Sequence, residues 1–334
     1  MKVVEVDNLY KSYFVSENKD FKSYFLKLLG KTQLKEIQAL KGISFAVELG
    51  EATAFIGRNG AGKSTTIKLL TGILKPTSGY ARVLGRDAFV GRQNNNYHIG
   101  AVFGQRCQLR WDISAYESFE LLKNIYKVSD EDFRVILNKF REILELDKFL
   151  YQPVRTLSLG QKMRVELCAA FLHRPQIVFL DEPTIGLDIF SKTVILNFLK
   201  RVKNKGNTTI FLTTHDTSDI EELCERTIIV EEGQILFDGL TSSIQSKINI
   251  GSQVVFTLEN TRPTLPGCFN HDYIEILDNQ MIVHKVTEKE LPLLLTEVLK
   301  SNRVLEMKVK SPDFKEVLKE FYQQKNIIKG VKNA

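Results

Sequence analysis

A glycine-rich turn between an apolar run and a helical pattern constrains the fold of this chain more than any other feature. Residues Gly57-Arg-Asn-Gly-Ala-Gly-Lys-Ser64 fit the pattern GxxxxGK[ST]. They directly follow the apolar run Ala52–Ile56 and precede a helical pattern over Thr65–Thr71. Glycines let the backbone curl so that several N–H groups point at a phosphate, and the helix N-terminus adds a positive dipole. This context favours a phosphate-binding loop over a glycine-rich turn without a ligand.

Two side chains of this loop carry the expected chemistry. Lys63 supplies a positive charge to the β- and γ-phosphates of a nucleotide, and the Ser64 hydroxyl is a ligand for Mg²⁺. A pair of acids is expected beside this loop, where the apolar run Ile177–Leu180 ends in Asp181 and Glu182 follows. Ligands of open α/β sheets bind at the carboxyl ends of the strands. Asp181 is therefore expected to hold Mg²⁺ through water, and Glu182 to polarise an attacking water as the general base.

The periodicity of the chain predicts an α/β architecture. Between residue 1 and about 248, short apolar runs typical of buried strands alternate with helical patterns. These runs are Ile43–Val47, Ala52–Ile56, Ile99–Val102, Ile177–Leu180, Thr209–Thr213 and Ile228–Val230. Such alternation indicates a mostly parallel sheet with helices on both faces, and a helical insert is expected over about 106–175.

The pattern restarts after Lys247 and predicts a small α+β domain over 249–334, after a first domain of 1–248. Its expected strands and helices are Val254–Leu258, Met281–Val286, Val304–Val309, Leu291–Lys300 and Phe314–Tyr322.

Composition narrows the class of protein. The sequence lacks any run of the roughly 20 apolar residues that a membrane-spanning helix needs, and its first residues lack the apolar core of a signal peptide. The four cysteines form no CxxC pair, which favours reduced thiols over zinc or disulfides. The net charge of +6 suits a protein at a membrane surface. Because 40 acidic residues dilute the 46 basic ones, we expect no nucleic-acid partner.

Four further motifs carry a family resemblance. They are Val102-Phe-Gly-Gln105, Leu157-Ser-Leu-Gly-Gln161, Gly186-Leu-Asp188 and Thr213-Thr-His215-Asp216. With the phosphate loop and Asp181-Glu182, their order and spacing resemble the ABC ATPase family over residues 1 to about 248. The resemblance implies a P-loop ABC cassette, with an antiparallel subdomain beside the core sheet and a helical insert.

The resemblance also implies roles for individual residues. The catalytic residues would be Glu182, His215, Gln105 and Lys63. Those binding ATP would be Tyr13, Arg58, Asn59, Gly60, Ala61, Gly62, Lys63, Ser64, Thr65, Gln105, Asp181 and His215, with Ser158, Gly160 and Gln161 acting on ATP held by a second copy. Mg²⁺ would be held by Ser64, by Gln105 and, through water, by Asp181. Asp188 would lie at the dimer interface.

Three points stay open within this resemblance. Tyr13 is expected to stack on adenine, although it could belong to the core, and Tyr10 is the alternative. The usual signature LSGGQ is LSLGQ here, so Leu159 replaces a glycine while Ser158, Gly160 and Gln161 are kept. Trp111 fits either an exposed anchor for a partner or packing within the helical insert.

The family implies an ATP-hydrolysing subunit on the cytoplasmic face of a bacterial inner membrane. Two copies would sandwich ATP and drive one or two permease chains. Stretches 108–112, 157–164, 183–188 and 311–318 are similar to a drug-, lipid- and polysaccharide-exporting branch. An importer ATPase is the nearest alternative. A soluble ABC ATPase acting on ribosomes or DNA is disfavoured, because such proteins usually have two cassettes or a long coiled-coil insert and this sequence shows neither. A module that binds ATP without hydrolysing it is disfavoured by Glu182 and His215.

A lysine-rich segment of about 16–38 looks like an insertion between two early strands. Phe21, Phe25, Leu28 and Leu29 fall at helical spacing, and Lys19, Lys22, Lys27 and Lys31 surround them. Basic residues around an aromatic-rich apolar face suit a membrane interface. We therefore expect a short helix against the permease or the bilayer surface. The alternative is that the stripe packs on the cassette's own sheet.

Overall fold

The computed structural model describes residues 1–16, 34–104, 107–244, 251–259, 263–267, 269–287, 289–310, 312 and 314–332. The chain divides into two compact units, Met1–Thr241 and Ser242–Ala334. The domain boundary at residue 248 remains a prediction, since 245–250 lie outside the described residues. The apolar stripe from Phe21 to Leu29 lies outside them as well.

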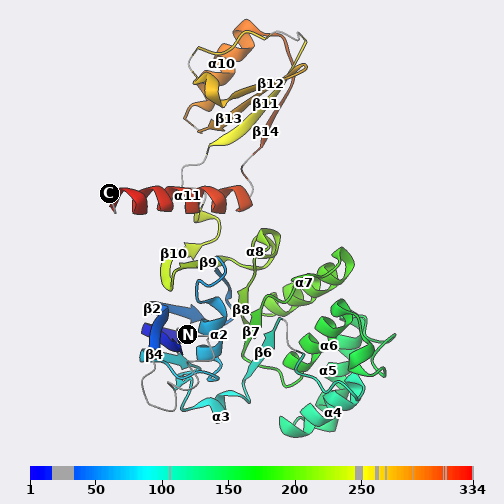
Figure 1. The fold of residues 1–334 in the computed structure, drawn as a ribbon. Coiled ribbons are helices and arrows are strands. Elements are labelled where there is room, and N and C mark those ends of the chain that lie inside the picture. The colour runs from blue at the N-terminus through cyan, green and yellow to red at the C-terminus, as the bar shows by residue number, and fades with distance from the viewer. Residues whose placement is uncertain are drawn as a thin grey trace. The chain divides into compact units, whose positions relative to one another are not determined.

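A six-stranded sheet forms the centre of the first unit (Figure 1). Its order is β10 (Gln234–Leu240), β9 (Arg226–Glu231), β3 (Ala52–Ile56), β8 (Thr209–Thr213), β7 (Ile177–Asp181) and β6 (Ile99–Phe103). All neighbours from β9 to β6 pair in parallel, and β10 is an antiparallel edge strand. Every residue of β3 and β8 is buried, as expected for strands covered on both faces. The mostly parallel sheet predicted from the sequence is confirmed.

Helices lie on both faces of this sheet. Figure 1 shows α2 (Lys63–Leu70) on one side, and α7 (Ile189–Lys203) and α8 (Thr217–Leu223) on the other. Ile67, Leu69 and Leu70 of α2 are buried in the core that fills one face. The two-faced cover that the sequence predicts is therefore confirmed.

A second, antiparallel sheet packs over α2. It has the order β2 (Leu34–Glu48), β1 (Lys2–Ser16), β4 (Ser78–Val83) and β5 (Arg86–Asp87). The ring centroid of Phe45 in β2 lies 5.7 Å from that of Phe55 and 6.0 Å from that of Phe211, so the two sheets share one aromatic core. This sheet is the antiparallel subdomain that the family resemblance implies.

The hairpin β1–β2 is longer than the sequence suggested. Ser16 pairs with Leu34, and Ser12 pairs with Gln38. The segment of about 16–38 was expected as an insertion, but its described ends belong to β1 and β2. Continued pairing of the two strands satisfies their backbone N–H and C=O groups.

Helices dominate the stretch between β6 and β7. They are α4 (Ala115–Ile125), α5 (Asp130–Ile143), the short 3₁₀ turn η1 (Val154–Thr156) and α6 (Leu159–Phe171); the one-turn α3 (Arg92–Asn95) precedes β6. Ser114 begins α4 with a capping box to Glu117, and the Ser129 side chain caps α5. The predicted helical insert is confirmed.

The second unit is a four-stranded antiparallel sheet with helices. The sheet order is β12 (Ile274–Leu277), β13 (Gln280–Val286), β11 (Ser252–Leu258) and β14 (Val304–Lys310). The turn η2 (His271–Tyr273) precedes β12, α10 (Leu291–Ser301) packs Leu294 and Val298 onto the sheet, and α11 spans Phe314–Lys332. The small α+β fold expected here is present, and α11 extends past the expected end at Tyr322.

Two expectations from composition, on membrane-spanning helices and on the cysteines, can be compared with the structure. No helix within the described ranges is long and apolar enough to span a membrane. Cys107, Cys168 and Cys224 are free thiols, and the fourth cysteine is not among the described residues.

Candidate functional site

The phosphate loop connects β3 to α2 with the backbone shape that its glycines allow. Gly60 and Gly62 have φ of 83° and 109°, in the region that favours glycine. A Cβ on Gly62 would lie 2.6 Å from Leu40 Cδ2 and 2.8 Å from the Ala39 carbonyl oxygen. Within the described chain, no side chain caps the first amides of α2, and its first turn holds no acidic residue. These N–H groups can therefore receive an anion.

Lys63 lies at the centre of the loop. Its Nζ donates to the Gly57 carbonyl at 2.8 Å and lies 4.0 Å from Glu182 Oε1. Burial lowers the pKa of this amine, and the carboxylates of Glu182 and Asp181 oppose that shift. The charge is thus oriented by the loop itself and points toward the end of β7.

The acidic pair at the end of β7 is held by the neighbouring strand. Asp181 pairs in register with Thr213 of β8, and the Thr213 hydroxyl donates to Asp181 Oδ1 at 2.6 Å. The amide of Glu182 donates to the Thr213 carbonyl at 2.9 Å. Glu182 has a φ of 54°, which is uncommon for a residue other than glycine and costs on the order of 1–3 kcal/mol. This backbone turns the Glu182 side chain toward His215.

His215 joins the two charged groups. Its Nε2 lies 2.7 Å from Glu182 Oε1 and 3.2 Å from Lys63 Nζ. When Nε2 carries the proton it donates to Glu182, and when Nδ1 carries it, Nε2 accepts from Lys63. Lys63, Glu182 and His215, which come from three separate segments of the sequence, therefore meet at one point. A cation beside the phosphates and a base that orients the attacking water recur in phosphoryl-transfer sites.

A cleft of about 590 Å³ opens beside this point. Its lining consists of Ser64, Lys68, Ile73, Phe103, Gly104, Gln108, Asp181 and Glu182. The Ser64 hydroxyl and the Asp181 carboxylate are hard oxygen ligands, the kind that Mg²⁺ prefers beside a nucleotide. The residues present therefore fit a magnesium nucleotide.

The signature segment begins a helix. Ser158 is the N-cap of α6, where its Oγ accepts from the Gln161 amide at 3.3 Å and Gln161 Oε1 accepts from the Ser158 amide at 2.9 Å. Ser158 and Leu159 are exposed, whereas Gly160 is buried. A Cβ on Gly186 would lie 3.4 Å from Leu159 Cδ2, so the unusual leucine lies over the turn that leads to Asp188. The capping box gives Ser158 and Gln161 a role within the chain that the motif did not reveal.

Asp188 caps the next helix. Its two carboxylate oxygens accept from the Ser191 amide at 2.9 Å and from the Ser191 hydroxyl at 2.7 Å, and these bonds lower the pKa of Asp188. A Cβ on Gly160 would lie 2.2 Å from Ser191 Oγ. The signature turn and the turn at Asp188 are therefore in direct contact.

Gln105 lies outside the described residues, and its expected role stays a prediction. Both flanks of it are anchored. The Gly104 amide donates to the Asp181 carbonyl at 2.8 Å, and Glu166 of α6 accepts the amides of Gln108 and Leu109 at 2.5 and 3.2 Å. Sequence reasoning missed Glu166, because a single acid in a helical pattern is usually exposed.

The remaining expected residues lie as follows. Tyr13 is half-buried in β1 opposite Ile37, with Lys11 Nζ 5.3 Å from its ring centroid, and its stacking on adenine remains a prediction. The alternative, Tyr10, packs its hydroxyl against Gly42. Arg58, Asn59 and Gly60 are exposed and Thr65 is half-buried. Trp111 is 56% exposed, with Lys162 Nζ 5.1 Å from its ring centroid, so it is not buried within the helical insert.

Known proteins share this sequence and fold. A family model described as ABC transporter matches residues 40–185. The linearmycin resistance ATP-binding protein LnrL of Bacillus subtilis is 30% identical over 258 residues, which cover 76% of this chain and 78% of that protein. The ABC transporter A family member 1 of Dictyostelium discoideum is 29% identical, and the match covers 75% of this chain but only 30% of that longer protein.

Among solved structures, a dimeric ATP-binding cassette in a post-hydrolysis state, bound to ADP and Pi, matches with a TM-score of 0.60. It is 26% identical, and the match covers 71% of this chain and 98% of that chain. This structure has the fold described above and belongs to an ATP-hydrolysing cassette. The chain therefore belongs to the ABC transporter family, in which it is an ATP-binding subunit with an ABC ATPase domain.

Proposed function

We propose that two copies of this chain close around two Mg-ATP molecules and drive permease chains that export a compound across a membrane. In each site the Lys63 loop of one copy binds the phosphates, and Ser158 and Gly160 of the other copy complete the cage. The chain would then act at the cytoplasmic face of a bacterial inner membrane, as a peripheral subunit.

The convergence of Lys63, Glu182 and His215 carries the hydrolytic part of this proposal. The 2.7 Å contact of His215 with Glu182 and the 4.0 Å approach of Lys63 to Glu182 support Glu182 as a base beside the phosphate loop. Glu182 accepts a proton from the attacking water, Lys63 neutralises the phosphates, and His215 holds the Glu182 carboxylate. Mg²⁺, held by Ser64 and through water by Asp181, would supply further charge neutralisation at the phosphates.

Dimerisation is supported by the surfaces that the cassette presents. The hydroxyl of Ser158 is exposed at the positive end of α6, where a phosphate from another copy can reach it. The solved relative is a dimer. Export is supported by the name of the Bacillus subtilis relative, which is a resistance protein. Exposed Trp111 fits a permease anchor.

The test is Glu182→Gln, which removes the base and keeps the size of the side chain. We expect ATP binding to persist, hydrolysis to slow by at least ~10²-fold, and an ATP-bound dimer to accumulate. Glu225→Gln is the matched control, since Glu225 pairs with Lys203 at the far end of α7 and not at the site. Near wild-type hydrolysis by Glu182→Gln in the assembled transporter would show that Glu182 is not the base.

Dimerisation is tested separately at Ser158. Ser158→Arg introduces a large side chain at the exposed end of α6, so it should prevent the ATP-dependent dimer of the Glu182→Gln background while ATP binding persists. Ser158→Ala, which adds no bulk, should leave dimer formation detectable. A dimer that forms equally well with Ser158→Arg would place the interface elsewhere.

A further inference from the structure

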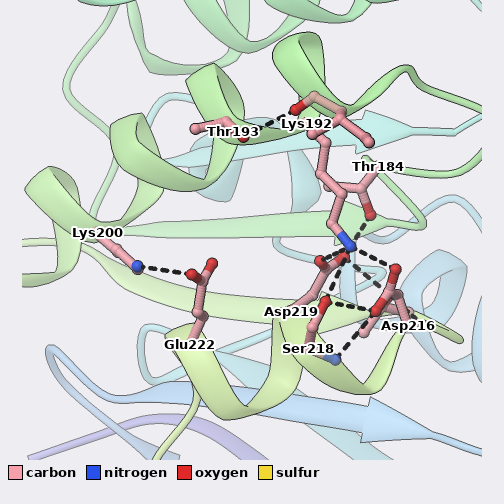
Figure 2. Close-up of polar contacts among 10 residues, drawn as sticks. Thr184, Lys192, Thr193, Lys200, Asp216, Ser218, Asp219 and Glu222 are labelled. Carbon is pink, nitrogen blue, oxygen red and sulfur yellow. Dashed lines mark hydrogen bonds and ion pairs between the residues drawn. The ribbon is translucent and has the colours of Figure 1, made fainter.

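An ionic cluster centred on a buried carboxylate joins two loops of the catalytic site from behind. Asp219 of α8 is fully buried, and its Oδ2 accepts the hydroxyl of Thr184 at 2.5 Å and that of Thr214 at 3.3 Å. Its Oδ1 lies 2.8 Å from Lys192 Nζ of α7. Figure 2 shows the Lys192 amine pointing between Asp219 and Asp216 from the opposite helix.

Three members of this cluster lie within four residues of positions that the sequence assigns to the site or to the dimer interface. Thr184 follows Glu182 by two residues, and Thr214 directly precedes His215. Lys192 lies one helical turn after Asp188, and its amide donates to the Asp188 carbonyl at 2.9 Å. One carboxylate thus binds the loop that carries Glu182 and Asp188 together with the loop that carries His215.

The cost of opening this cluster makes the two loops move together. A buried carboxylate that loses its cation or its hydrogen bonds is strongly destabilising. If either loop shifts, Asp219 loses a partner unless the other loop follows. Burial lowers the pKa of Lys192, but its bonds to Asp216 and Asp219 outweigh burial and leave that pKa raised, so the amine stays charged. Asp216 also caps α8 through the Ser218 amide at 3.0 Å.

Stability between the two helices does not explain the buried pair. Lys200 of α7 pairs with Glu222 of α8 at 3.1 Å, and Lys203 pairs with Glu225. Both of these pairs lie nearer the surface and farther from the loops, and Figure 2 shows Lys200–Glu222 apart from the cluster. Apolar side chains of similar volume would hold two helices together at least as well as a buried ion pair. The specific geometry of the cluster therefore matters more than its contribution to packing.

We propose that Lys192 and Asp219 are positioning residues that couple the turn at Asp188 to the His215 loop. The family resemblance implies that Asp188 lies at the dimer interface and that His215 binds ATP. Resting on the proposed function, the pair then transmits the approach of the second copy to the His215 loop. Neither residue touches the reacting atoms. Their role is to fix the distance between two loops that do.

Thr184→Val tests this coupling with the smallest change, because it removes only the hydroxyl that links the Glu182 loop to Asp219. Thr193→Val is the matched control, since the Thr193 hydroxyl donates to the Ile189 carbonyl of its own helix and bonds no other group among the described residues (Figure 2). Lys192→Met removes the cation, and Lys192→Arg restores it. Lys192→Met combined with Asp219→Asn removes both charges and avoids an unpaired buried carboxylate, so it remains informative if Lys192→Met alone fails to fold.

Amide hydrogen exchange of the isolated chain is the first measurement, and it does not depend on hydrolysis or dimerisation. Thr184→Val and the Lys192 variants without a cation should raise exchange by ~10-fold or more in both segments, 183–191 and 213–217. Thr193→Val and Lys200→Met should raise it in neither segment. An increase confined to one segment, or equal increases in the control variants, would overturn the coupling.

Steady-state hydrolysis is the second measurement. The coupling predicts that kcat falls by about tenfold and the Hill coefficient for ATP falls toward one, while the ATP affinity of the isolated chain stays within about twofold. Lys192→Arg should recover most of both losses. Unchanged kcat and cooperativity in Lys192→Met combined with Asp219→Asn would refute the positioning role. If the Glu182→Gln background shows no ATP-dependent dimer, the proposed function fails, and hydrogen exchange still decides the coupling.

Discussion

Gly160 offers a sharp test of why the signature segment needs a glycine. Under the proposed function this residue lies near the phosphate of a second copy, yet the structure gives a reason for the glycine within the chain. A Cβ at this position would lie 2.2 Å from Ser191 Oγ and 2.7 Å from Ser191 Cβ. Both distances are too short for real contacts, and the Ser191 Cβ cannot rotate away. Gly160→Ala should therefore push α6 from the start of α7.

The magnitude follows from two opposing effects. Overpacking of a close contact costs about 1–3 kcal/mol, and replacing a helical glycine by alanine returns about 0.5–1 kcal/mol. Gly160→Ala should thus lower the free energy of unfolding by roughly 0.5–2 kcal/mol. Ser191→Gly makes room for the new methyl group and keeps the backbone amide of residue 191, which donates a hydrogen bond to Asp188. A double-mutant cycle should then show a favourable coupling energy of about 1–2 kcal/mol between the two substitutions.

Urea unfolding of the four proteins gives the coupling, and ATP turnover is measured on the same samples. We expect the double variant to recover hydrolysis to within about threefold of Ser191→Gly, since the added methyl group points at α7. Additive effects on stability, within ~0.5 kcal/mol, would refute the steric reasoning. A double variant that regains its stability but not its hydrolysis would show that Gly160 is needed for approach of the second copy.

Three further outcomes follow from the site and its surroundings. Lys63→Ala should lose ATP affinity itself in a direct binding titration, because its charge acts on bound ATP as well as on the transition state; unchanged affinity would contradict its role. Leu159→Gly should leave ATP turnover within about twofold, because the leucine lies over Gly186 and is 50% exposed, while the free energy of unfolding falls by about 1–2 kcal/mol. Burial lowers the pKa of His173, which bonds the Ile99 carbonyl, from 6.5 to about 4, so the unfolded chain binds the extra proton first as the pH falls. The free energy of unfolding should therefore drop by at most about 3 kcal/mol between pH 6.5 and 4. Unfolding curves measured across this pH range would show the drop, and His173→Gln should make it smaller.

The strands that sequence could predict are those buried on both faces. The runs in β3 and β8 are apolar or small, bounded by polar residues, and their limits match the prediction. The strands β4, β5, β10 and β12 were missed because most of their residues are exposed or half-exposed and none has an apolar run longer than three residues; β4 buries only two of its six residues. Their strand character comes from pairing with neighbours, which a local pattern does not contain.

In the candidate site too, the residues in motifs could be predicted and the partners that hold them could not. The motifs predict which residue types meet a phosphate, and Lys63, Glu182 and His215 do lie together. The partners that hold them could not be predicted, because Thr184 and Asp219 are 35 residues apart and meet only through the order of the sheet. Glu166 gave no signal either, since it accepts the backbone amides of Gln108 and Leu109, and backbone partners have no sequence signature.

The geometry at Ser158 and Glu182 bears on how such a cassette changes over generations. The capping box of Ser158 contributes about 1 kcal/mol to the chain's own stability, so selection for folding alone keeps this serine. Glu182 is in the opposite position, because its φ of 54° makes glycine or asparagine the more stable choice there. A lineage that no longer hydrolyses ATP should therefore lose the glutamate early and keep the serine long. In relatives of this chain, an intact glutamate at this strained position is therefore a better sign of ATP hydrolysis than an intact serine in the signature segment.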